Sequence, residues 1–377
     1  MSKQFPSVDP EGLLEYSVVF TDRSLNHMSQ VFQQVMRDIS ATLKRTYNAT
    51  AVAVVPGGGT YGMEAVARQL ATGRHCLVVR NGWFSYRWSQ IFETGSIPAK
   101  ETVLKARRLQ DAPQSPFAPP PIEEVVASIQ REKPDLVFAP HVETASGIIL
   151  PDDYLKALAD AVHAHGGLFV LDCVASGAAW VDMKACGVDV LISAPQKGWS
   201  ASPCAALIML GEAGLERVQN TKSTSFACDL LKWLQIMQAY ENGGHAYHAT
   251  LPTDGLTRFR DSMLETEKRG LETLRNNQWE LGARVRALLA QHGFPSVAAE
   301  GFGAPGVVVS YTTDPEIQNG KKFIAQGMQT AAGVPLMCDE PADYQSFRLG
   351  LFGLDKLLDV DGAIAHLEQV LTAITRG

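Results

Sequence analysis

The chain of 377 residues lacks several features that would mark particular classes of protein. Its six cysteines form no CxxC pair, which argues against a zinc ribbon or a thioredoxin-type redox motif. No apolar run approaches the roughly 18 residues of a membrane-spanning helix. The first residues are polar and have no apolar signal-peptide segment. We therefore expect a cytoplasmic protein with no metal site and no membrane contact.

The charge balance also argues against nucleic acid as a partner. Lys and Arg total 33 against 40 Asp and Glu, so the formal net charge is -7. We expect no nucleic-acid binding from such a chain, although a local basic pocket could still bind a small anion. Hydrophobic residues make up 46% and charged residues 19%, which excludes a disordered chain and allows a large buried core.

Short runs that are wholly or almost wholly apolar recur between residues 51 and 210. They are Ala51–Val55, Cys76–Val79, Leu136–Ala139, Leu168–Leu171, Val188–Ile192 and Ala205–Met209. Most lack alternating polar residues, which indicates strands buried on both faces. Segments with helical spacing, such as Asp152–His165, lie between several of them. This alternation predicts an α/β fold, with a mainly parallel central sheet sandwiched by helices.

The pattern changes after about residue 255. A long helix is predicted over 256–292 with a break near Gly270, then a strand over 306–311, a helix over 315–331, a strand over 346–350 and a helix over 360–375. We predict a large α/β domain over residues 21–260 and a smaller α+β domain over residues 261–377. Residues 1–20 are expected to associate with the smaller domain.

A glycine-rich turn, Pro56-Gly-Gly-Gly-Thr60, follows the first predicted strand and precedes a helix. Consecutive glycines let the backbone approach an anion, and the helix N-terminus and a threonine hydroxyl favour phosphate. The turn also spells GxGxxG through Gly57, Gly59 and Gly62, so a dinucleotide site stays open. Arg80, however, stands where a ribose-binding acid is expected. A plain turn is the third interpretation.

Charged side chains follow two more predicted strands. Asp172 ends the run Leu168–Leu171, and Lys197 comes shortly after the run that ends at Ile192. Parallel strands end at one edge of a sheet, where open α/β folds bind their ligands. A phosphate cradle, a carboxylate and a lysine are the groups that pyridoxal 5'-phosphate needs. The lysine forms a Schiff base with its aldehyde, and the carboxylate keeps its ring nitrogen protonated.

These motifs and their order resemble the class V branch of the fold-type I pyridoxal-phosphate enzymes, close to the alanine–glyoxylate and serine–pyruvate aminotransferases. The resemblance covers about residues 20–375. The segments that carry it are Gly57-Gly-Gly-Thr-Tyr-Gly-Met-Glu-Ala65, Asn81-Gly-Trp-Phe-Ser-Tyr-Arg-Trp88, His141-Val-Glu-Thr144, Asp172-Cys-Val174, Ser193-Ala-Pro-Gln-Lys197, Ala246-Tyr-His-Ala-Thr-Leu-Pro252 and Phe347-Arg-Leu-Gly-Leu-Phe-Gly353.

The resemblance implies roles for individual side chains. Lys197 and Asp172 are the predicted catalytic residues, Phe84 would stack on the cofactor ring, and Arg348 would bind the substrate carboxylate. It also implies a homodimer, in which Tyr247 and Thr250 reach the phosphate held by the other subunit. The predicted cofactor-binding residues are Gly58, Gly59, Thr60, Phe84, Thr144, Asp172, Val174, Gln196, Lys197, Tyr247 and Thr250.

The resemblance further implies an aminotransferase that moves an amino group from an alanine- or serine-type donor to glyoxylate or pyruvate, with ping-pong kinetics. A lyase or an aminophosphonate transaminase on the same scaffold, and an NADP-dependent oxidoreductase built on the GxGxxG turn, stay open as alternatives. The chain departs from the family pattern at two places. Gly58 stands where many members carry a hydroxyl residue, and the segment 20–29 replaces a Pro-Gly-Pro signature, so Arg23 and His27 could recognise an unusual substrate.

Overall fold

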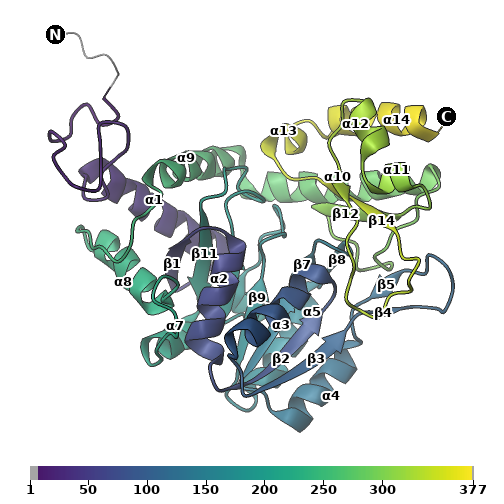
Figure 1. Cartoon of the computed structure of the whole chain (residues 1–377), viewed down its shortest axis with the longest axis horizontal. Coiled ribbons are helices and arrows are strands. Elements are labelled where there is room, and N and C mark those ends of the chain that lie inside the picture. The colour runs from purple at the N-terminus through teal and green to yellow at the C-terminus, as the bar shows by residue number, and fades with distance from the viewer. Residues whose placement is uncertain (1–6, 376–377) are drawn as a thin grey trace.

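The computed structural model describes residues 7–375, which form a large and a small domain (Figure 1). The first half of the large domain contains α1 (Gln30–Tyr47), β1 (Ala51–Pro56), α2 (Gly59–Val66), a π-helical turn (Ala67–Ala71), β2 (His75–Arg80), α3 (Trp83–Gly95), β3 (Lys100–Lys105), β4 (Arg107–Arg108), β5 (Phe117–Ala118) and α4 (Ile122–Glu132). The second half contains β6 (Leu136–Pro140), β7 (Val142–Glu143), β8 (Ile148–Ile149), α5 (Asp152–His163), β9 (Leu168–Asp172), α6 (Met183–Cys186), β10 (Val190–Ser193), β11 (Ala205–Leu210), α7 (Glu212–Gln219), α8 (Leu230–Glu241) and α9 (Thr253–Arg269).

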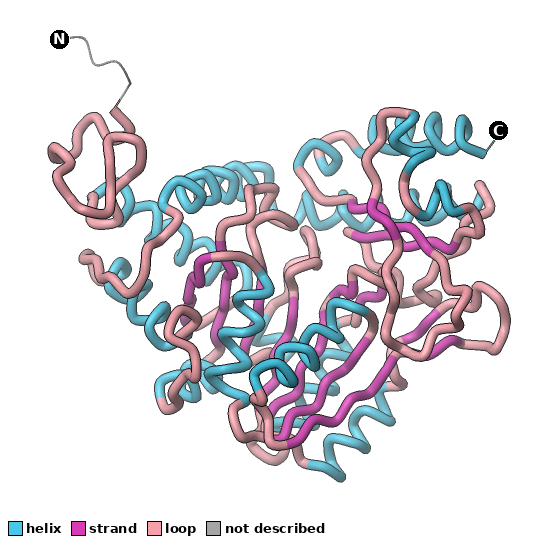
Figure 2. Tube along the Cα trace, in the orientation of Figure 1, coloured by secondary structure: helices cyan, strands magenta, loops and turns pink. Residues whose placement is uncertain are grey.

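The central sheet has seven strands in the order β1-β11-β10-β9-β6-β2-β3, and Figure 2 shows them side by side. The strands from β10 to β3 are parallel, whereas β11 runs antiparallel to both of its neighbours. Every residue of β6, β9, β10 and β11 is buried, which explains why these strands appear in the sequence as unbroken apolar runs. The mainly parallel α/β fold is confirmed.

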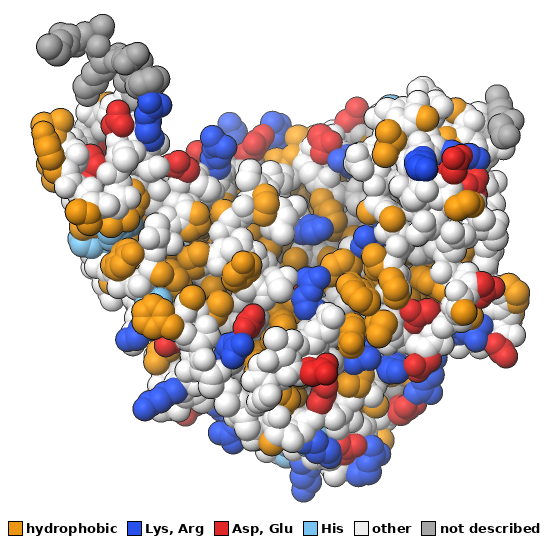
Figure 3. All heavy atoms as spheres, in the orientation of Figure 1, with side chains coloured by type: hydrophobic (Ala, Val, Ile, Leu, Met, Phe, Trp, Pro, Cys, Tyr) orange, Lys and Arg blue, Asp and Glu red, His pale blue; other side chains and the backbone are white. Residues whose placement is uncertain are grey.

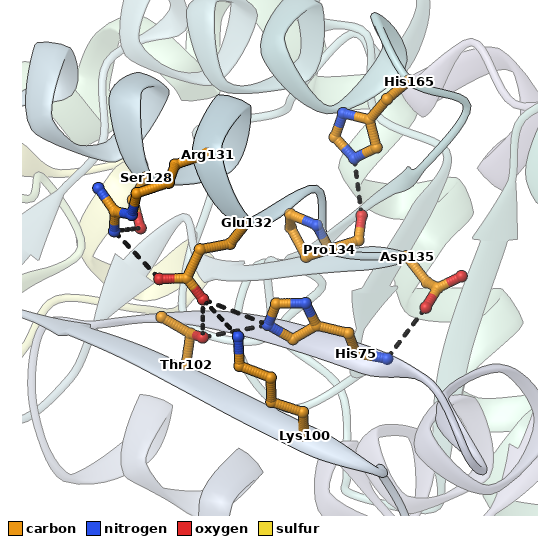
Figure 4. A network of polar contacts seen from close by, with 9 residues as sticks. All are labelled: His75, Lys100, Thr102, Ser128, Arg131, Glu132, Pro134, Asp135 and His165. Carbon is orange, nitrogen blue, oxygen red and sulfur yellow. Dashed lines mark hydrogen bonds and ion pairs between the residues drawn. The ribbon is translucent and has the colours of Figure 1, made fainter.

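Strand β3 was not among the predicted strands, because it lies at the edge of the sheet and carries charged residues. A polar network ties it to the end of α4 (Figure 4). The Glu132 carboxylate accepts hydrogen bonds from Thr102 Oγ1 at 2.7 Å, Lys100 Nζ at 3.0 Å and Arg131 Nη2 at 3.0 Å. These hydrogen bonds lower the pKa of Glu132 to about 2. The network therefore adds to the apolar packing of the edge strand, of which Val103 and Leu104 contact the core.

The small domain contains α10 (Leu271–Gln291), β12 (Val307–Tyr311), α11 (Pro315–Gln318), α12 (Lys321–Ala325), β13 (Ala331–Ala332), β14 (Ser346–Gly350), α13 (Leu354–Leu357) and α14 (Val360–Thr375). Its three strands form an antiparallel sheet in the order β12-β14-β13. The single helix expected over 315–331 is wrong. The structure has two short helices there, separated at Gly320, whose φ of 81° does not suit a right-handed helix.

The predicted break near Gly270 is present, since α9 ends at Arg269 and Gly270 has a φ of 90°. Phe259 and Met263 on α9 belong to the core of the large domain, whereas Leu274 on α10 belongs to the core of the small domain. The two cores therefore separate near Gly270, ten residues after the expected boundary at residue 260. A third apolar cluster joins the domains and includes Val142 and Ile148 from one side and Val307 and Val309 from the other.

The N-terminal segment lies at the far end of the molecule from α14 (Figure 1). Glu15 accepts a hydrogen bond from Asn26 Nδ2 at 2.9 Å, so the segment folds back toward the start of α1. Within one chain, residues 7–20 thus lie apart from the small domain with which they were expected to associate, and residues 1–6 fall outside the described residues. Among the described helices, none combines the length and the apolar character needed to span a membrane.

Candidate active site

The glycine-rich turn lies between β1 and α2, as the sequence predicts. Gly57 has a φ of 119°, a left-handed conformation that favours glycine. Gly59 packs closely against Val174, since an added Cβ would lie 2.7 Å from Val174 Cγ2. Gly58 differs, because an added Cβ there would meet no atom within 4 Å. The turn thus leaves open space directly in front of the N-terminus of α2, where amide N–H groups can bind an anion.

Asp172 ends β9 and is 8% exposed. Its Oδ1 accepts a hydrogen bond from the backbone N–H of Val174 at 2.9 Å. Burial, with a smaller contribution from the nearby Glu143 carboxylate, raises the pKa of Asp172 to about 6. No Lys, Arg or His side chain of the described residues forms an ion pair with it. This carboxylate is therefore suited to pair with a cation that is supplied from outside the chain.

Lys197 follows the end of β10 and is half-buried. Its Nζ lies 4.9 Å from the centroid of the Phe352 ring. Burial lowers the pKa of Lys197, and the positive charge of Arg348 lowers it further. A lowered pKa increases the fraction of neutral amine, which is the nucleophilic form.

Phe84 lies in the first turn of α3 and brings two arginines together. The guanidinium carbon of Arg348, on β14, is 5.7 Å from the centroid of the Phe84 ring, and that of Arg87 is 5.2 Å away. Arg348 donates from Nε to the backbone oxygen of Ala332 at 2.8 Å, which leaves the two Nη groups free to bind an anion. Phe84 therefore connects an arginine of the small domain to the large-domain half of the site.

Glu143 fixes the position of Phe84 and is fully buried. Its carboxylate accepts hydrogen bonds from the backbone N–H groups of Phe84 at 3.2 Å and Ser85 at 2.9 Å, and from the Ser85 hydroxyl at 2.6 Å. It also accepts from the N–H of Ala145 at 2.9 Å. Since the first N–H groups of a helix have no partner within it, Glu143 stabilises the start of α3.

His141 and Gln196 belong to two of the segments that carry the family resemblance. His141 Nδ1 lies 2.7 Å from Ser176 Oγ, and burial lowers the pKa of this histidine to about 3, so its ring is neutral. Gln196 Oε1 is buried without a hydrogen-bond partner in the part of the chain that the structure describes. An unpartnered buried amide oxygen is costly, so Gln196 is suited to accept a hydrogen bond from a bound molecule.

Most of the predicted site residues fall into one connected set. Thr60 Oγ1 accepts a hydrogen bond from Arg87 Nη1 at 2.9 Å. Arg87 and Arg348 both lie by the Phe84 ring, and the charge of Arg348 lowers the pKa of Lys197. Thr144 lies next to Glu143 and is half-buried. Figure 3 shows Lys and Arg side chains in the middle of this face, between the domains, with hydrophobic side chains around them.

Tyr247 and Thr250 lie outside this connected set. The Tyr247 hydroxyl is 3.3 Å from Thr250 Oγ1, and its ring is 5.5 Å from that of His27. Tyr247 is 57% exposed. Within one chain, these two residues thus contact each other and the segment before α1, and they leave the phosphate turn uncovered.

Arg87, Glu143 and Phe352 have roles in this site that the sequence motifs did not indicate. Arg87 follows Phe84 by three residues, which places both on one face of a helix, so the spacing was a usable signal. Phe352 lies inside the segment 347–353 that was already singled out. Nothing in the sequence indicated that Glu143 would stabilise a helix start 58 residues away.

The side chains present fit pyridoxal 5'-phosphate. The open turn before α2 suits its phosphate, and the buried Asp172 without a cation partner suits its ring nitrogen. The Lys197 amine suits its aldehyde, and Phe84 offers an aromatic face for its ring. In the described residues, no group of three or more His, Cys, Asp or Glu side chains could hold a metal ion.

Comparisons with known proteins agree with this geometry. Residues 12–300 match the sequence profile of the family described as aminotransferase class-V. The chain is 24% identical over 373 residues to a protein of Synechococcus sp. named soluble hydrogenase, small subunit, and the alignment covers 98% of this chain and 92% of that one. It is 27% identical over 277 residues to the alanine–glyoxylate aminotransferase of Rattus norvegicus, which covers 72% of this chain and 64% of the rat enzyme.

Solved structures have the same fold. The crystal structure of an alanine–glyoxylate aminotransferase from Nostoc sp. aligns with a TM-score of 0.76 and 20% identity, covering 92% of this chain and 89% of that one. An aspartate aminotransferase of subgroup IV from Thermus thermophilus aligns with a TM-score of 0.74 and 24% identity, covering 93% of both chains. Since both identities are low, these alignments establish the architecture alone.

Proposed function

Because the chain belongs to the class-V aminotransferase family and is a pyridoxal-phosphate-dependent transaminase, we propose that it transfers an amino group from a small amino acid of the alanine or serine type to a small 2-oxo acid. Glyoxylate and pyruvate are the proposed acceptors. The observation that supports the proposal is the position of Arg348. Its guanidinium lies by the Phe84 ring, and its positive charge lowers the pKa of the Lys197 amine. A substrate carboxylate held by Arg348 would thus lie beside the reactive amine.

Each side chain then has a stated task. Arg348 binds the carboxylate through two parallel hydrogen bonds and orients Cα. Lys197 would hold the cofactor through its amine and would act as the general base that takes a proton from the substrate Cα. Asp172 remains ionised beside the cofactor's ring nitrogen and keeps that nitrogen protonated, and Phe84 limits the tilt of the ring. When bound, pyridoxal phosphate supplies the electron sink that makes Cα acidic.

The names of several relatives support glyoxylate as the acceptor. The relatives include alanine–glyoxylate aminotransferases of mammals and an L-aspartate–glyoxylate aminotransferase of Paracoccus denitrificans. Two donors thus occur with one acceptor among these names. For this chain we propose glyoxylate first, with alanine as the first donor to test.

We also propose that the enzyme works as a homodimer in the cytoplasm, with the site at the subunit interface. Thr60 and Tyr247 are exposed in the single chain, and so are apolar side chains of the N-terminal segment, among them Leu13 and Val18. A second subunit that covers these residues would bury apolar surface and close the phosphate turn.

A single-turnover experiment tests the function. The protein loaded with pyridoxal phosphate is mixed with one amino donor and no acceptor, and the cofactor is then extracted and quantified. We expect conversion to pyridoxamine 5'-phosphate with alanine or serine, and re-conversion on adding glyoxylate. Release of ammonia from the donor without pyridoxamine phosphate would instead establish a lyase.

The Lys197→Ala variant tests the assigned lysine. We expect it to fold, to lose the visible absorption band of the bound cofactor and to lose turnover. Lys184→Ala removes an exposed lysine of α6 and serves as the matched control. Full activity in the Lys197→Ala variant would remove Lys197 from the mechanism.

A further inference from the structure

Arg87 lies beside the phosphate turn, at a site where the chain lacks a hydroxyl. Gly58 has no side chain to offer, and the space around its missing Cβ is empty to 4 Å. From the second turn of α3, Arg87 Nη1 donates to Thr60 Oγ1 at 2.9 Å. Thr60 itself belongs to the first turn of α2, whose N–H groups face that open space. The Arg87 guanidinium is thus connected to the anion site by one hydrogen bond, through the Thr60 hydroxyl.

Arg87 also lacks a carboxylate within ion-pair distance in the described part of the chain, and its longer-range charge effect is on Asp172, whose pKa it lowers. The Arg87 side chain is half-buried. Its other contact is with the Phe84 ring, 5.2 Å from the centroid, and that contact satisfies none of its N–H donors. Since half-buried guanidinium groups gain most from an anionic partner with two acceptors, Arg87 is suited to a phosphate monoester dianion.

We propose that Arg87 binds the phosphate of pyridoxal 5'-phosphate directly, together with the N–H groups of the turn at Gly58 and Gly59 and with the Thr60 hydroxyl. The guanidinium compensates for the hydroxyl missing at position 58. This inference rests on the proposed function, because it takes the cofactor as the occupant of the site. It adds a residue that the sequence motifs did not indicate.

A second acidic group on the substrate is the competing partner for Arg87. The contacts favour the phosphate. Arg87 donates to the helix turn that opens the phosphate cradle, whereas Arg348 approaches the Phe84 ring from the small domain and acts on Lys197. We therefore expect Arg87 to bind the phosphate end of the ligand that stacks on Phe84, and Arg348 to bind the substrate carboxylate near Lys197.

Two forms of the cofactor test the proposal, because pyridoxal lacks the phosphate. Cofactor-free wild type and the Arg87→Gln variant are titrated with pyridoxal 5'-phosphate and with pyridoxal, and binding is followed by the visible absorption band. We expect Arg87→Gln to weaken pyridoxal-phosphate binding about tenfold or more and to leave pyridoxal binding unchanged. Arg37→Gln, which removes a half-buried arginine of α1, is the matched control and should bind both as the wild type does.

Two more variants make the test specific. Arg87→Lys keeps the charge but loses the planar fork, so we expect an intermediate loss, and it replaces Arg87→Gln should that variant not fold. Gly58→Ser fits the open space and should recover part of the affinity in the Arg87→Gln background. A larger gain in this background than in the wild type would indicate that both positions act on the same phosphate, because independent positions give equal gains.

The remaining outcomes overturn the inference. An equal loss for pyridoxal and pyridoxal phosphate would give Arg87 a structural role only. Unchanged cofactor affinity, with a raised KM confined to donors that carry a second acidic group, would assign Arg87 to the substrate. Failure of the wild type itself to bind pyridoxal phosphate would contradict the proposed function rather than the role of Arg87.

Discussion

Asp172 is a buried acid that forms no ion pair with any Lys, Arg or His of the described residues, and the positive charge of Arg87 offsets only part of the effect of burial on its pKa. Its pKa in the folded protein is about 6 against 3.8 for an ordinary aspartate, so folded protein binds more protons than unfolded protein between these values. Stability contributed by this group is therefore present below pH 4 and is lost as the pH rises through 6. We expect Asp172→Asn to stabilise the cofactor-free protein at pH 7 by about 1–3 kcal/mol.

Urea unfolding of the cofactor-free protein at pH 4 and pH 7 measures this effect. The gain should vanish at pH 4, and the same variant should lose transamination because an amide cannot keep the ring nitrogen protonated. Asp160→Asn, an exposed carboxylate of α5, provides the control. If Asp172→Asn and wild type lose stability equally between the two pH values, Asp172 does not carry the buried charge.

Arg348 is oriented for substrate binding by a hydrogen bond within the protein. Its Nε is held by Ala332, so the guanidinium is already oriented before a substrate arrives. We expect Arg348→Ala to raise the KM for carboxylate donors, at a cost of about 2–4 kcal/mol in transition-state stabilisation. Steady-state kinetics with alanine give this value. Arg348→Lys should lie in between, and an unchanged KM in Arg348→Ala would remove this arginine from the substrate site.

Helix α2 carries the phosphate turn, and its distance from the sheet is set by one glycine. An added Cβ at Gly62 would lie 2.6 Å from Ala206 Cβ on β11, which cannot move without the strand. Gly62→Ala must therefore shift α2. We expect a loss of about 1–3 kcal/mol in the free energy of unfolding, despite the better helix propensity of alanine, together with weaker binding of pyridoxal phosphate.

Gly58→Ala is the matched control for stability, because an added Cβ there meets no atom within 4 Å. Denaturant unfolding of both variants tests the packing argument. Equal stabilities of Gly62→Ala and Gly58→Ala would mean that α2 is free to move on the sheet.

Elements whose burial dominates their composition could be predicted from the sequence. The apolar runs that became β1, β2, β6, β9, β10 and β11 are buried throughout or nearly so, and α14 spans the predicted residues 360–375. The edge strand β3 could not be predicted this way, because the Glu132 network holds it through polar groups that are distant in sequence. The predicted helix over 315–331 failed at Gly320, where local backbone geometry outweighed the helical pattern.

The same distinction applies to the site. Gly58, Asp172 and Lys197 stand at strand ends, and the rule that parallel strands share an edge is enough to group them. The roles of Glu143 and Arg87 depend on contacts across elements, with the start of α3 in one case and with Thr60 on α2 in the other. Spacing along the chain carries no record of such contacts, so the roles emerge only from coordinates.

At the scale of the whole molecule, the site depends on the third apolar cluster, which joins the large domain to the small one. Arg348 comes from the small domain, whereas Phe84 and Lys197 come from the large domain. The cluster fixes these three residues relative to one another. Tyr247 and Thr250, by contrast, form a hydrogen bond with each other, and among the described residues they form no hydrogen bond or ring contact with this set. The dimer that we propose would bring them to the phosphate turn of the partner.

Mixed dimers test this arrangement. One chain carries Lys197→Ala, and the other carries Tyr247→Ala with Thr250→Val, so each homodimer lacks one required part in both of its sites. If the loop acts across the interface, a mixed dimer combines Lys197 of one chain with the intact loop of the other in one of its two sites. We expect co-expression to restore about a quarter of wild-type activity, because random pairing makes half of the dimers mixed.

The activity of the mixed dimer depends on which subunit's site the loop completes. A loop that served the site of its own chain would leave both sites of the mixed dimer defective, and the mixture would then be no more active than its parents. Light scattering on the purified protein supplies the independent control, since a mass of one chain would exclude any such complementation. Recovery of activity therefore requires both that the chain is dimeric and that Tyr247 and Thr250 reach across to the neighbouring site.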